Sequence, residues 1–589
     1  MSTLTLTPEQ DLAAAWTPTM GSATVVAGAG SGKTTLIVEI VTRLVRRGGP
    51  PIIVATFTSK VGVELRARLG GRGVVVGAQV AHVGTLHSLA LKRRSRVEPG
   101  KWSTLRCVNL PAKERTPGVP HALTLWRRVV GGASRDVEEV ESQVSYWRAH
   151  GLTREKTPAG CPAIIRRYLC EYLNLLDSNS AWDFDLCVEA DLAAVPAGSD
   201  YTVIVDEAQD CNQVQFDYVR ALAAKSAYLL VGDFRQSVYA FRGAVPGVFG
   251  KASTNLACFP ISQNFRSHRR IVAAANRLPF PGQLPMQSVH DAEGKLTITD
   301  PFEDEEDEDN FIACSIKRLI EAGTPMTEIA VLGRTNARLV ELRSTLEEMD
   351  IPVQMKASSL FDGREARALV AYLVLANIDA GNSLIEVLNV PYRRIPTMDA
   401  EKHVRAGKRA GKDVFAILAS CPGPKNEVAN LSTLLRSLRT QATWEAKVDM
   451  AATVILLKLK AEAAKKPADR GDTESSVGAV EAAARIAKRF SRHGADAFRR
   501  LADFVDRDRR HDSENRNAVT LSTVHSAKGL QWSVGFVAAS LGQFPHVRGD
   551  PEEERRLFYV AVTRWKHELT ITSTGAISPL SAVIGGTAG

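Results

Sequence analysis

Long hydrophobic runs are missing from this 589-residue sequence. No stretch of about 18 apolar residues occurs, so we expect neither a membrane span nor a membrane partner. The first ten residues, MSTLTLTPEQ, lack a basic segment followed by an apolar one, so we also expect no secretory signal. Cysteine is sparse, with eight residues and no CxxC pair. These absences fit reduced thiols and a cytosolic location.

Half of the cysteines nevertheless fall within one region, and they are Cys107, Cys161, Cys170 and Cys187. Two interpretations of this group are open. The four residues either hold a metal ion or an iron–sulfur cluster, or they are scattered, reduced and mostly buried thiols. The absence of paired metal-site spacing favours the second interpretation.

The composition is that of a globular chain with room for roughly three to five domains. Hydrophobic residues make up 44% and charged residues 24% of the chain, and both values are ordinary. The net charge of +9 allows a polyanionic partner without requiring one.

Residues 24–44, TVVAGAGSGKTTLIVEIVTRL, contain the clearest motif. A short apolar run predicts a buried strand, a Gly-rich turn follows, and apolar residues then recur at helical spacing. This order is typical of a P-loop, whose backbone N–H groups surround phosphates at a helix N-terminus. Lys33 can reach the β- and γ-phosphates, and the Thr34 hydroxyl can ligate Mg²⁺. Ala27 stands where the generic pattern has Gly, and a chance Gly-rich turn is the alternative.

Two more predicted strands end in polar residues. Residues 201–205 lead to Asp206 and Glu207, which suit Mg²⁺ binding and activation of the attacking water, respectively. Residues 228–231 lead to Gln236, which is expected near the phosphates.

Two aromatic residues and an arginine follow this third strand, at Tyr239, Phe241 and Arg242. Aromatics among basic residues suit base stacking on a single strand, and the alternative is that the two rings fill the core. Near the N-terminus, Thr7 can cap a helix that carries Gln10. The Gln10 amide can pair with an adenine edge, and a surface role is the alternative.

The order of these motifs resembles that of the UvrD/Rep/PcrA family of superfamily 1 DNA helicases. The matching segments span residues 10–564, nearly the whole chain, and comprise Gln10, AGAGSGKT (27–34), TFTSK (56–60), GTLHS (84–88), DEAQD (206–210), GDFRQSVYAFRGA (232–244), SQNFRS (262–267), STVHSAKGLQW (522–532) and EEERRLFYVAVTR (552–564).

This resemblance implies ATP and Mg²⁺ as cofactors and assigns residues to three kinds of site. Catalytic roles fall on Lys33, Asp206, Glu207, Gln236, Arg266 and Arg564, the two arginines acting on the γ-phosphate. ATP contacts fall on Gln10, Ala27, Gly28, Ala29, Gly30, Ser31, Gly32, Lys33, Thr34, Thr35, Arg68, Phe265, Arg266, Gln531 and Arg564. DNA contacts fall on Phe57, Thr58, Lys60, Thr85, His87, Tyr239, Phe241, Arg242 and His525. Mg²⁺ is expected on Thr34 and Asp206.

Several positions depart from the family pattern. Phe234 and Arg235 replace two acidic residues, Phe265 replaces a Tyr that stacks on adenine, and Phe241 replaces a base-stacking Trp. The Gly-Ile-Gly turn that contacts duplex DNA in the family corresponds to residues 391–396, PYRRIP, without either glycine. Two outcomes are open here: the duplex contact is weakened, or Arg393 and Arg394 hold duplex phosphates themselves.

The resemblance also implies an α/β fold with two RecA-like, doubly wound P-loop motor domains, each with a helical insertion. We expect the first motor domain at 1–94 and 196–255 with its insertion at 95–195. We expect the second at 256–377 and 517–577 with its insertion at 378–516, followed by a tail at 578–589.

The implied function is that of an ATP-dependent 3′–5′ DNA helicase on single-stranded DNA and single-strand/duplex junctions, in repair, recombination or replication. One alternative is a DNA-dependent translocase that displaces proteins or serves a defence or repair complex, with a repair or nuclease protein as partner. A nucleotide-switched scaffold without motor action is a third hypothesis, and the intact Glu207 and both arginines argue against it.

Overall fold

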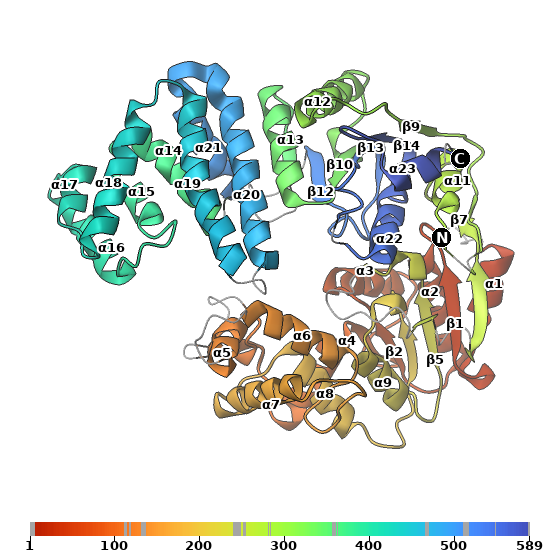
Figure 1. The fold of residues 1–589 in the computed structure, drawn as a ribbon. Helices are drawn as coiled ribbons and strands as arrows, with labels where there is room; N and C mark the ends of the chain where they lie inside the picture. The colour runs from red at the N-terminus through yellow and green to blue at the C-terminus, as the bar shows by residue number, and fades with distance from the viewer. Residues whose placement is uncertain are drawn as a thin grey trace. The chain divides into compact units, whose positions relative to one another are not determined.

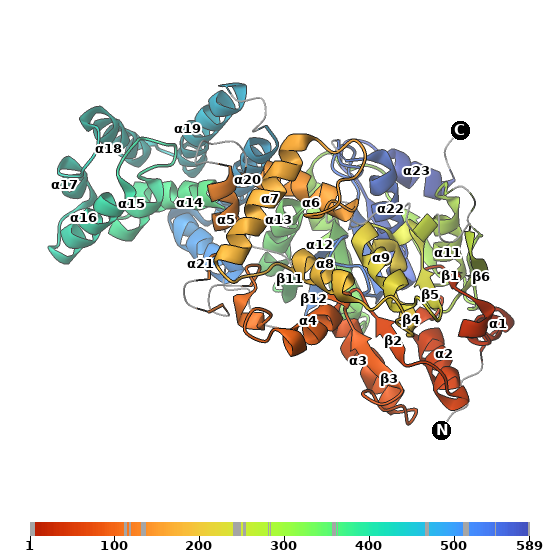
Figure 2. The same cartoon turned by 90° about the horizontal axis from the view of Figure 1, so that it is seen from below.

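The computed structural model describes residues 6–110, 115–116, 119–130, 137–238, 249–250, 255–280, 282, 284–355, 361, 363–465, 470–509, 517–547 and 549–586. The chain divides into two compact units. The first comprises Met1–Leu296, Arg548–His567 and Ala582–Gly589, and the second comprises Thr297–Val547 and Glu568–Ser581. Figures 1 and 2 show their helices and strands in two views.

A six-stranded sheet forms the centre of the first unit, in the order β3-β2-β4-β5-β1-β6. Its strands are β1 (Ala23–Ala27), β2 (Ile52–Ala55), β3 (Val80–Gly84), β4 (Thr202–Val205), β5 (Tyr228–Gly232) and β6 (Ala257–Ile261). Every neighbouring pair is parallel, and Val25 of β1 lies opposite Val231 of β5 and Phe259 of β6. The carboxyl ends of all six strands therefore meet at one edge, where ligands bind in such sheets.

Helices cover both faces of this sheet, because alternate strand residues point to opposite faces. Ile52 and Val54 pack into one apolar cluster, and Ile53 and Ala55 pack into the other. The first cluster includes residues of α1 (Pro8–Ala14), α2 (Lys33–Arg47) and α3 (Ser59–Gly70). The second includes residues of α4 (Leu86–Val97), α8 (Phe184–Ala194) and α9 (Gln213–Leu222). This is a doubly wound parallel sheet.

A helical segment separates β3 from β4 in the sequence. It includes α5 (Ala122–Val129), α6 (Val137–Ala149) and α7 (Ala163–Ser178) as well as α8. Trp126 stacks on Tyr172 with ring centroids 4.1 Å apart. Arg148, which is buried on α6, pairs with Asp183 at 2.7 Å and Glu189 at 2.9 Å. The segment thus has an apolar core of its own and a buried ion pair network that ties α6 to α8.

The remaining elements of the first unit follow β6. They are β7 (Gln263–Asn264), α11 (Arg269–Arg277), β8 (Gln287–Ser288) and α22 (Pro551–Val562).

The second sheet has the order β11-β12-β10-β13-β14-β9. Its strands are β9 (Lys295–Ile298), β10 (Ile329–Gly333), β11 (Val353–Met355), β12 (Val519–Thr523), β13 (Trp532–Ala538) and β14 (Trp565–Thr572). β10 pairs in parallel with β12 and β13, and β11 pairs in parallel with β12. Residues of α12 (Glu305–Glu321) and α13 (Asn336–Glu348) pack on these strands. The acidic run at 303–309 opens α12, with Asp304 as its N-cap, as negative charge at a helix N-terminus favours.

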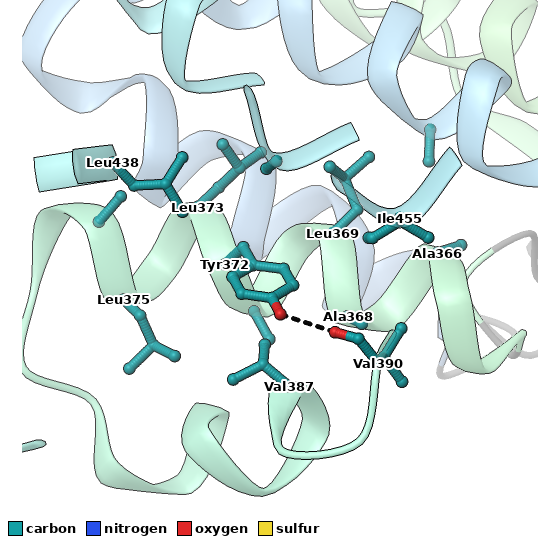
Figure 3. Packing of buried hydrophobic residues seen from close by; sticks show 14 of the residues in the cluster. Ala366, Ala368, Leu369, Tyr372, Leu373, Leu375, Val387, Val390, Leu438 and Ile455 are labelled. Atoms are coloured by element: carbon teal, nitrogen blue, oxygen red, sulfur yellow. Dashed lines mark hydrogen bonds between the residues drawn. The ribbon is translucent and has the colours of Figure 1, made fainter. Parts of the chain in front are cut away.

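The second unit also holds a larger group of helices, which share one apolar cluster. They are α14 (Arg364–Asn377), α15 (Gly381–Val387), α16 (Thr397–Arg409), α17 (Val414–Ala419), α18 (Lys425–Thr440), α19 (Trp444–Lys465), α20 (Arg470–Arg489) and α21 (Ala497–Arg509). Figure 3 shows α14 inside this cluster, to which the helix contributes Leu369, Tyr372 and Leu373. The Tyr372 hydroxyl donates to the Val390 carbonyl at 2.6 Å and so satisfies its one polar atom.

The predicted fold class, a mixed α/β protein with two doubly wound domains and helical insertions, is confirmed. The exact domain boundaries stay predictions. No helix among the described residues is long and apolar enough to cross a membrane. Within the same part of the chain, no group of three or more His, Cys, Asp or Glu is placed to hold a metal ion. Burial raises the pKa of Cys107 to about 11 and that of Cys187 to about 12, as expected for inert thiols.

Charged side chains, rather than apolar ones alone, join α20 to α12 and α13. Arg489 of α20 pairs with Asp309 of α12, and Arg485 of α20 pairs with Glu341 of α13 at 2.9 Å. Burial raises the pKa of Glu341 to about 7, with Arg485 opposing this effect and the adjacent Glu305 adding to it. A buried carboxyl group that titrates near neutral pH makes this contact between helices sensitive to pH.

We predict that Glu341→Gln reduces the loss of stability on raising the pH from about 5 to about 8. A carboxyl group with a raised pKa in the folded state stabilises the fold while protonated, and that stabilisation is lost as the pH rises from 4.5 toward 7. Glutamine stays neutral across this range. Near pH 8 the free energy of unfolding of the variant should therefore exceed that of the wild type by about 1–3 kcal/mol.

Thermal unfolding followed by circular dichroism across this range measures the effect. Glu347→Gln is the matched control, since Glu347 lies on the same helix and pairs with Arg343. Parallel pH profiles for the wild type and Glu341→Gln would contradict the prediction.

Candidate nucleotide site

The phosphate loop connects β1 to α2 and takes its shape from two glycines. Gly30 and Gly32 have φ values of 69° and 76°, the left-handed region that favours glycine. A Cβ on Gly30 would lie 2.7 Å from the Arg266 Cβ, so only glycine fits there. Leu36, Ile37 and other apolar residues of α2 fix the helix in the core, so its N-terminus faces the loop.

Lys33, the first residue of α2, lies inside this loop. Its Nζ donates to the Ala27 carbonyl at 3.4 Å and is 3.9 Å from Glu207 Oε1. The two residues come from separate motifs, and the sheet brings them together because β4 and β1 end at the same edge. The structure thus places the predicted phosphate cation beside the predicted catalytic carboxylate.

The two carboxylates after β4 have different surroundings. Asp206 is buried, and its Oδ1 accepts from the Glu207 backbone N–H at 3.0 Å. Glu207 has a φ of 51°, an unfavourable conformation for a residue with a side chain and one that is concentrated at active sites. The Gln209 amide donates to Glu207 Oε2 at 2.5 Å and accepts from the Asp233 backbone N–H at 3.1 Å. The sequence interpretation missed Gln209, although it stands within the DEAQD motif.

Gln236 lies in a short turn after β5 and is buried. Its Nε2 donates to Asp233 Oδ2 at 2.9 Å, and its Oε1 accepts from Arg564 Nη2 at 3.3 Å. Asp233 Oδ2 also accepts from the Tyr559 hydroxyl at 3.2 Å. Asp233 and Tyr559 are further residues that the motif analysis did not single out, because only the fold brings α22 to this turn.

The two predicted arginines both lie against the C-terminal end of α22. Arg266 donates to the Thr563 carbonyl at 2.8 Å, and Arg564 donates to the Val560 carbonyl at 2.9 Å. Burial lowers the pKa of Arg266 to about 10. Burial, with repulsion from Arg266, lowers the pKa of Arg564 to about 9. Their surroundings therefore disfavour the cationic forms, and an anion beside them would be stabilising.

The other predicted ATP contacts of the first unit lie beside the loop or on α2 and α3. Gln10 is buried and donates to the Ser31 carbonyl at 3.0 Å, while its Oε1 accepts from the Thr7 backbone N–H at 3.2 Å. Phe265 is 40% exposed, and its backbone N–H donates to the Gly30 carbonyl at 2.8 Å. Arg68 Nη1 donates to Thr35 Oγ1 at 3.3 Å. Gln531 is exposed and belongs to the second unit.

Four predicted DNA contacts line one cavity of about 410 Å³ in the first unit, and they are Phe57, Thr58, Thr85 and His87. Asp206 and Glu207 line the same cavity, together with residues of α6, α7 and α8. Thr58 and Thr85 also cap α3 and α4, so their hydroxyls have a structural use. The His87 ring contacts Phe184 edge-on, with centroids 5.6 Å apart.

The remaining predicted DNA contacts lie elsewhere. Lys60 is exposed on α3, and His525 lies between β12 and β13 in the second unit. Tyr239, Phe241 and Arg242 lie outside the described residues, and their roles stay predictions.

Two models of known protein families match this chain. The model of the UvrD/REP helicase N-terminal domain matches residues 6–257, and that of the UvrD-like helicase C-terminal domain matches residues 259–575. The chain belongs to the UvrD-like helicase family. At the level of this family, the predicted enzyme class of an ATP-dependent DNA helicase is confirmed, and so is the use of ATP.

Curated relatives of this UvrD-like helicase share about a quarter of its residues, and each match covers most of both chains. The ATP-dependent DNA helicase PcrA of Staphylococcus epidermidis is 26% identical over 614 residues, which cover 94% of this chain and 82% of the relative. The putative ATP-dependent DNA helicase YjcD of Bacillus subtilis is 26% identical over 604 residues, which cover 94% of this chain and 77% of YjcD. PcrA of Staphylococcus aureus is likewise 26% identical, with coverage of 94% and 81%.

We predict that Arg266→Ala and Arg564→Ala retain ADP affinity while ATP turnover falls roughly 10²- to 10³-fold. The reason is that a γ-phosphate would relieve the electrostatic cost of burying both cations, and ADP lacks that group. Steady-state ATPase rates and ADP titrations measure the two effects. Arg270→Ala is the control, because Arg270 is exposed and pairs with Glu293. Equal losses of ADP and ATP binding in either variant would contradict the assignment.

Proposed function

We propose that this UvrD-like helicase hydrolyses ATP at the phosphate loop of its first unit and uses the energy to move 3′ to 5′ along single-stranded DNA, unwinding duplex ahead of it. The curated relatives carry the name ATP-dependent DNA helicase. The cavity that Glu207 shares with Phe57 and His87 carries the proposal, because a strand bound there would lie beside the hydrolytic carboxylate.

Each residue of the site then has a role. Lys33 binds the β- and γ-phosphates, and Glu207 orients and deprotonates the attacking water. Gln236 links that water to Arg564, and Arg266 and Arg564 stabilise negative charge that develops on the γ-phosphate. A hydroxyl and a carboxylate are oxygen donors of the kind that Mg²⁺ prefers, so Thr34 and Asp206 fit as its ligands. Mg²⁺ would neutralise phosphate charge in the transition state.

The direction of movement and the domain ranges rest on the family resemblance. We assign the two motor domains to residues 1–94 with 196–255 and to residues 256–377 with 517–577. The predicted stacking residues Tyr239 and Phe241 belong to the same proposal, since they stand three and five residues after Gln236 in the sequence.

Arg393 does not fit the proposed role of a duplex phosphate contact. Its side chain is buried and donates to the Val387 carbonyl at 2.8 Å, the Pro391 carbonyl at 3.1 Å and the Tyr372 hydroxyl at 2.7 Å. Arg393 therefore stabilises the turn from its buried side. The interpretation that Arg393 holds a duplex phosphate is wrong. Arg394 is exposed, and Lys458 Nζ donates to the carbonyl of the neighbouring Tyr392 at 2.7 Å.

A translocase that unwinds poorly on its own is the second candidate function. The turn at 391–396 favours it, because Arg394 and Pro396 stand on either side of Ile395, in place of the two glycines of the Gly-Ile-Gly turn. Glycines let a backbone approach phosphates closely, so without them a duplex contact at this turn would fall on side chains. The two candidates share the ATPase and differ in strand displacement.

We predict an ATPase that single-stranded DNA stimulates strongly and that falls roughly 10²-fold or more in Lys33→Ala and in Glu207→Gln. ATP hydrolysis with and without a single strand tests the ATPase, and displacement of 3′-tailed, 5′-tailed and blunt duplexes tests direction. A rate indifferent to DNA would contradict the proposal. DNA-stimulated hydrolysis without displacement of any duplex would favour the translocase.

We predict that Arg394→Ala combined with Lys458→Ala weakens binding to a 3′-tailed duplex about 3- to 10-fold and reduces its salt dependence, because two phosphate cations are lost. Binding to single-stranded DNA should not change. Lys460→Ala is the matched control, since Lys460 lies on the same helix and pairs with Glu481. An unchanged duplex affinity in the double variant would exclude this surface as the duplex contact.

A further inference from the structure

Arg235 lies in the turn Phe234–Gln236 after β5, and its side chain is buried. Its backbone N–H and its Nε donate to Asp233 Oδ1, at 3.1 Å and 2.9 Å. Asp233 has no exposed surface, so its charge depends entirely on partners inside the protein. Arg235 forms the ion pair with it.

The Arg235 guanidinium also contacts the phosphate loop. A Cβ on Gly28 would lie 2.9 Å from Arg235 Nη2, so the Gly28 backbone packs directly against the guanidinium. The Arg235 Cζ lies 4.9 Å from the centroid of the Tyr559 ring, a cation–π contact. An anion, an aromatic ring and the first glycine of the phosphate loop therefore hold this one side chain in place.

Asp233 connects Arg235 to the residues proposed to act on ATP. Its Oδ2 accepts from Gln236 Nε2 and from the Tyr559 hydroxyl, and Gln236 Oε1 accepts from Arg564 Nη2. A continuous series of contacts thus runs from the phosphate loop at Gly28, through Arg235 and Asp233, to Gln236 and Arg564.

We propose that Arg235 is a positioning residue for ATP hydrolysis, which fixes the Gln236 amide through Asp233 and supports the phosphate loop at Gly28 without contacting the nucleotide. This inference rests on the proposed function of the same site. Burial acts to raise the pKa of Asp233, and the charges of Arg235 and Lys33 outweigh it, so that the pKa is lowered.

The experiment compares Arg235→Met and Arg235→Lys with the wild type in DNA-stimulated ATP hydrolysis. Methionine keeps an unbranched apolar stem and removes the guanidinium with its charge, so kcat should fall about 10- to 100-fold while nucleotide affinity changes less than about 3-fold. Lysine restores the charge without the planar guanidinium. The kcat of Arg235→Lys should therefore lie between that of Arg235→Met and that of the wild type.

Phe234→Leu is the matched control, because Phe234 lies in the same turn and its ring packs on Phe249 at 4.8 Å between centroids. Its kcat should equal that of the wild type.

Three results would overturn the inference. A wild-type kcat in folded Arg235→Met would show that Asp233 and Gln236 keep their places without the arginine. Equal losses of kcat, nucleotide affinity and melting temperature would show general structural support. If Arg235→Met does not fold, a wild-type kcat in Arg235→Lys decides against the role. A wild-type protein without ATPase activity would instead overturn the proposed function, and the inference with it.

Discussion

Two backbone segments approach each other so closely at Gly30 that no side chain fits between them, and the nucleotide site of this helicase depends on that contact. The Gly30 carbonyl accepts from the Phe265 backbone N–H, and Asn264 Nδ2 donates to the Ala29 carbonyl at 2.7 Å. Residues far apart in the sequence are thereby joined directly. This contact places Phe265 and Arg266 beside the phosphate loop.

The electrostatics of the site follow from the end of α22. A helix C-terminus carries partial negative charge, and Arg266 and Arg564 both donate to carbonyls of its last turn or its cap. These carbonyls satisfy hydrogen bonds, yet they do not offset the burial of two neighbouring cations, as the lowered pKa values show. The folded protein thus holds unfavourable positive charge where a polyphosphate would compensate it, which is how preorganised sites stabilise developing charge.

Local patterns in the sequence were sufficient to predict where the strands, the phosphate loop and the two carboxylates after β4 lie. Residues 24–26, 201–205 and 228–231 are short apolar runs, and all three fall in buried parallel strands, with only Tyr201 left outside. Motif order was sufficient to predict that Lys33 and Glu207 lie close together, since parallel strands end at one edge of the sheet. Arg266 and Arg564 were assigned from the resemblance alone, and the structure places both arginines at the end of α22.

Other features depend on contacts between distant segments, which no local pattern reports. The sequence shows two adjacent arginines at 393 and 394, and only the fold distinguishes the buried one from the exposed one. Gln209, Asp233 and Tyr559 were missed in part for the same reason, because Gln209 accepts from the Asp233 backbone N–H and Tyr559 donates to Asp233 across separate elements.

The contact of Arg235 with Gly28 and Tyr559 also bears on how this protein can change over generations. A substitution at any one of these three positions leaves the others with a gap, a clash or an uncompensated charge. Their histories should therefore be coupled in one direction: lineages that keep Arg235 should keep a residue without a side chain at 28 and an aromatic ring at 559. The packing of one guanidinium thus limits which residues two distant positions can carry.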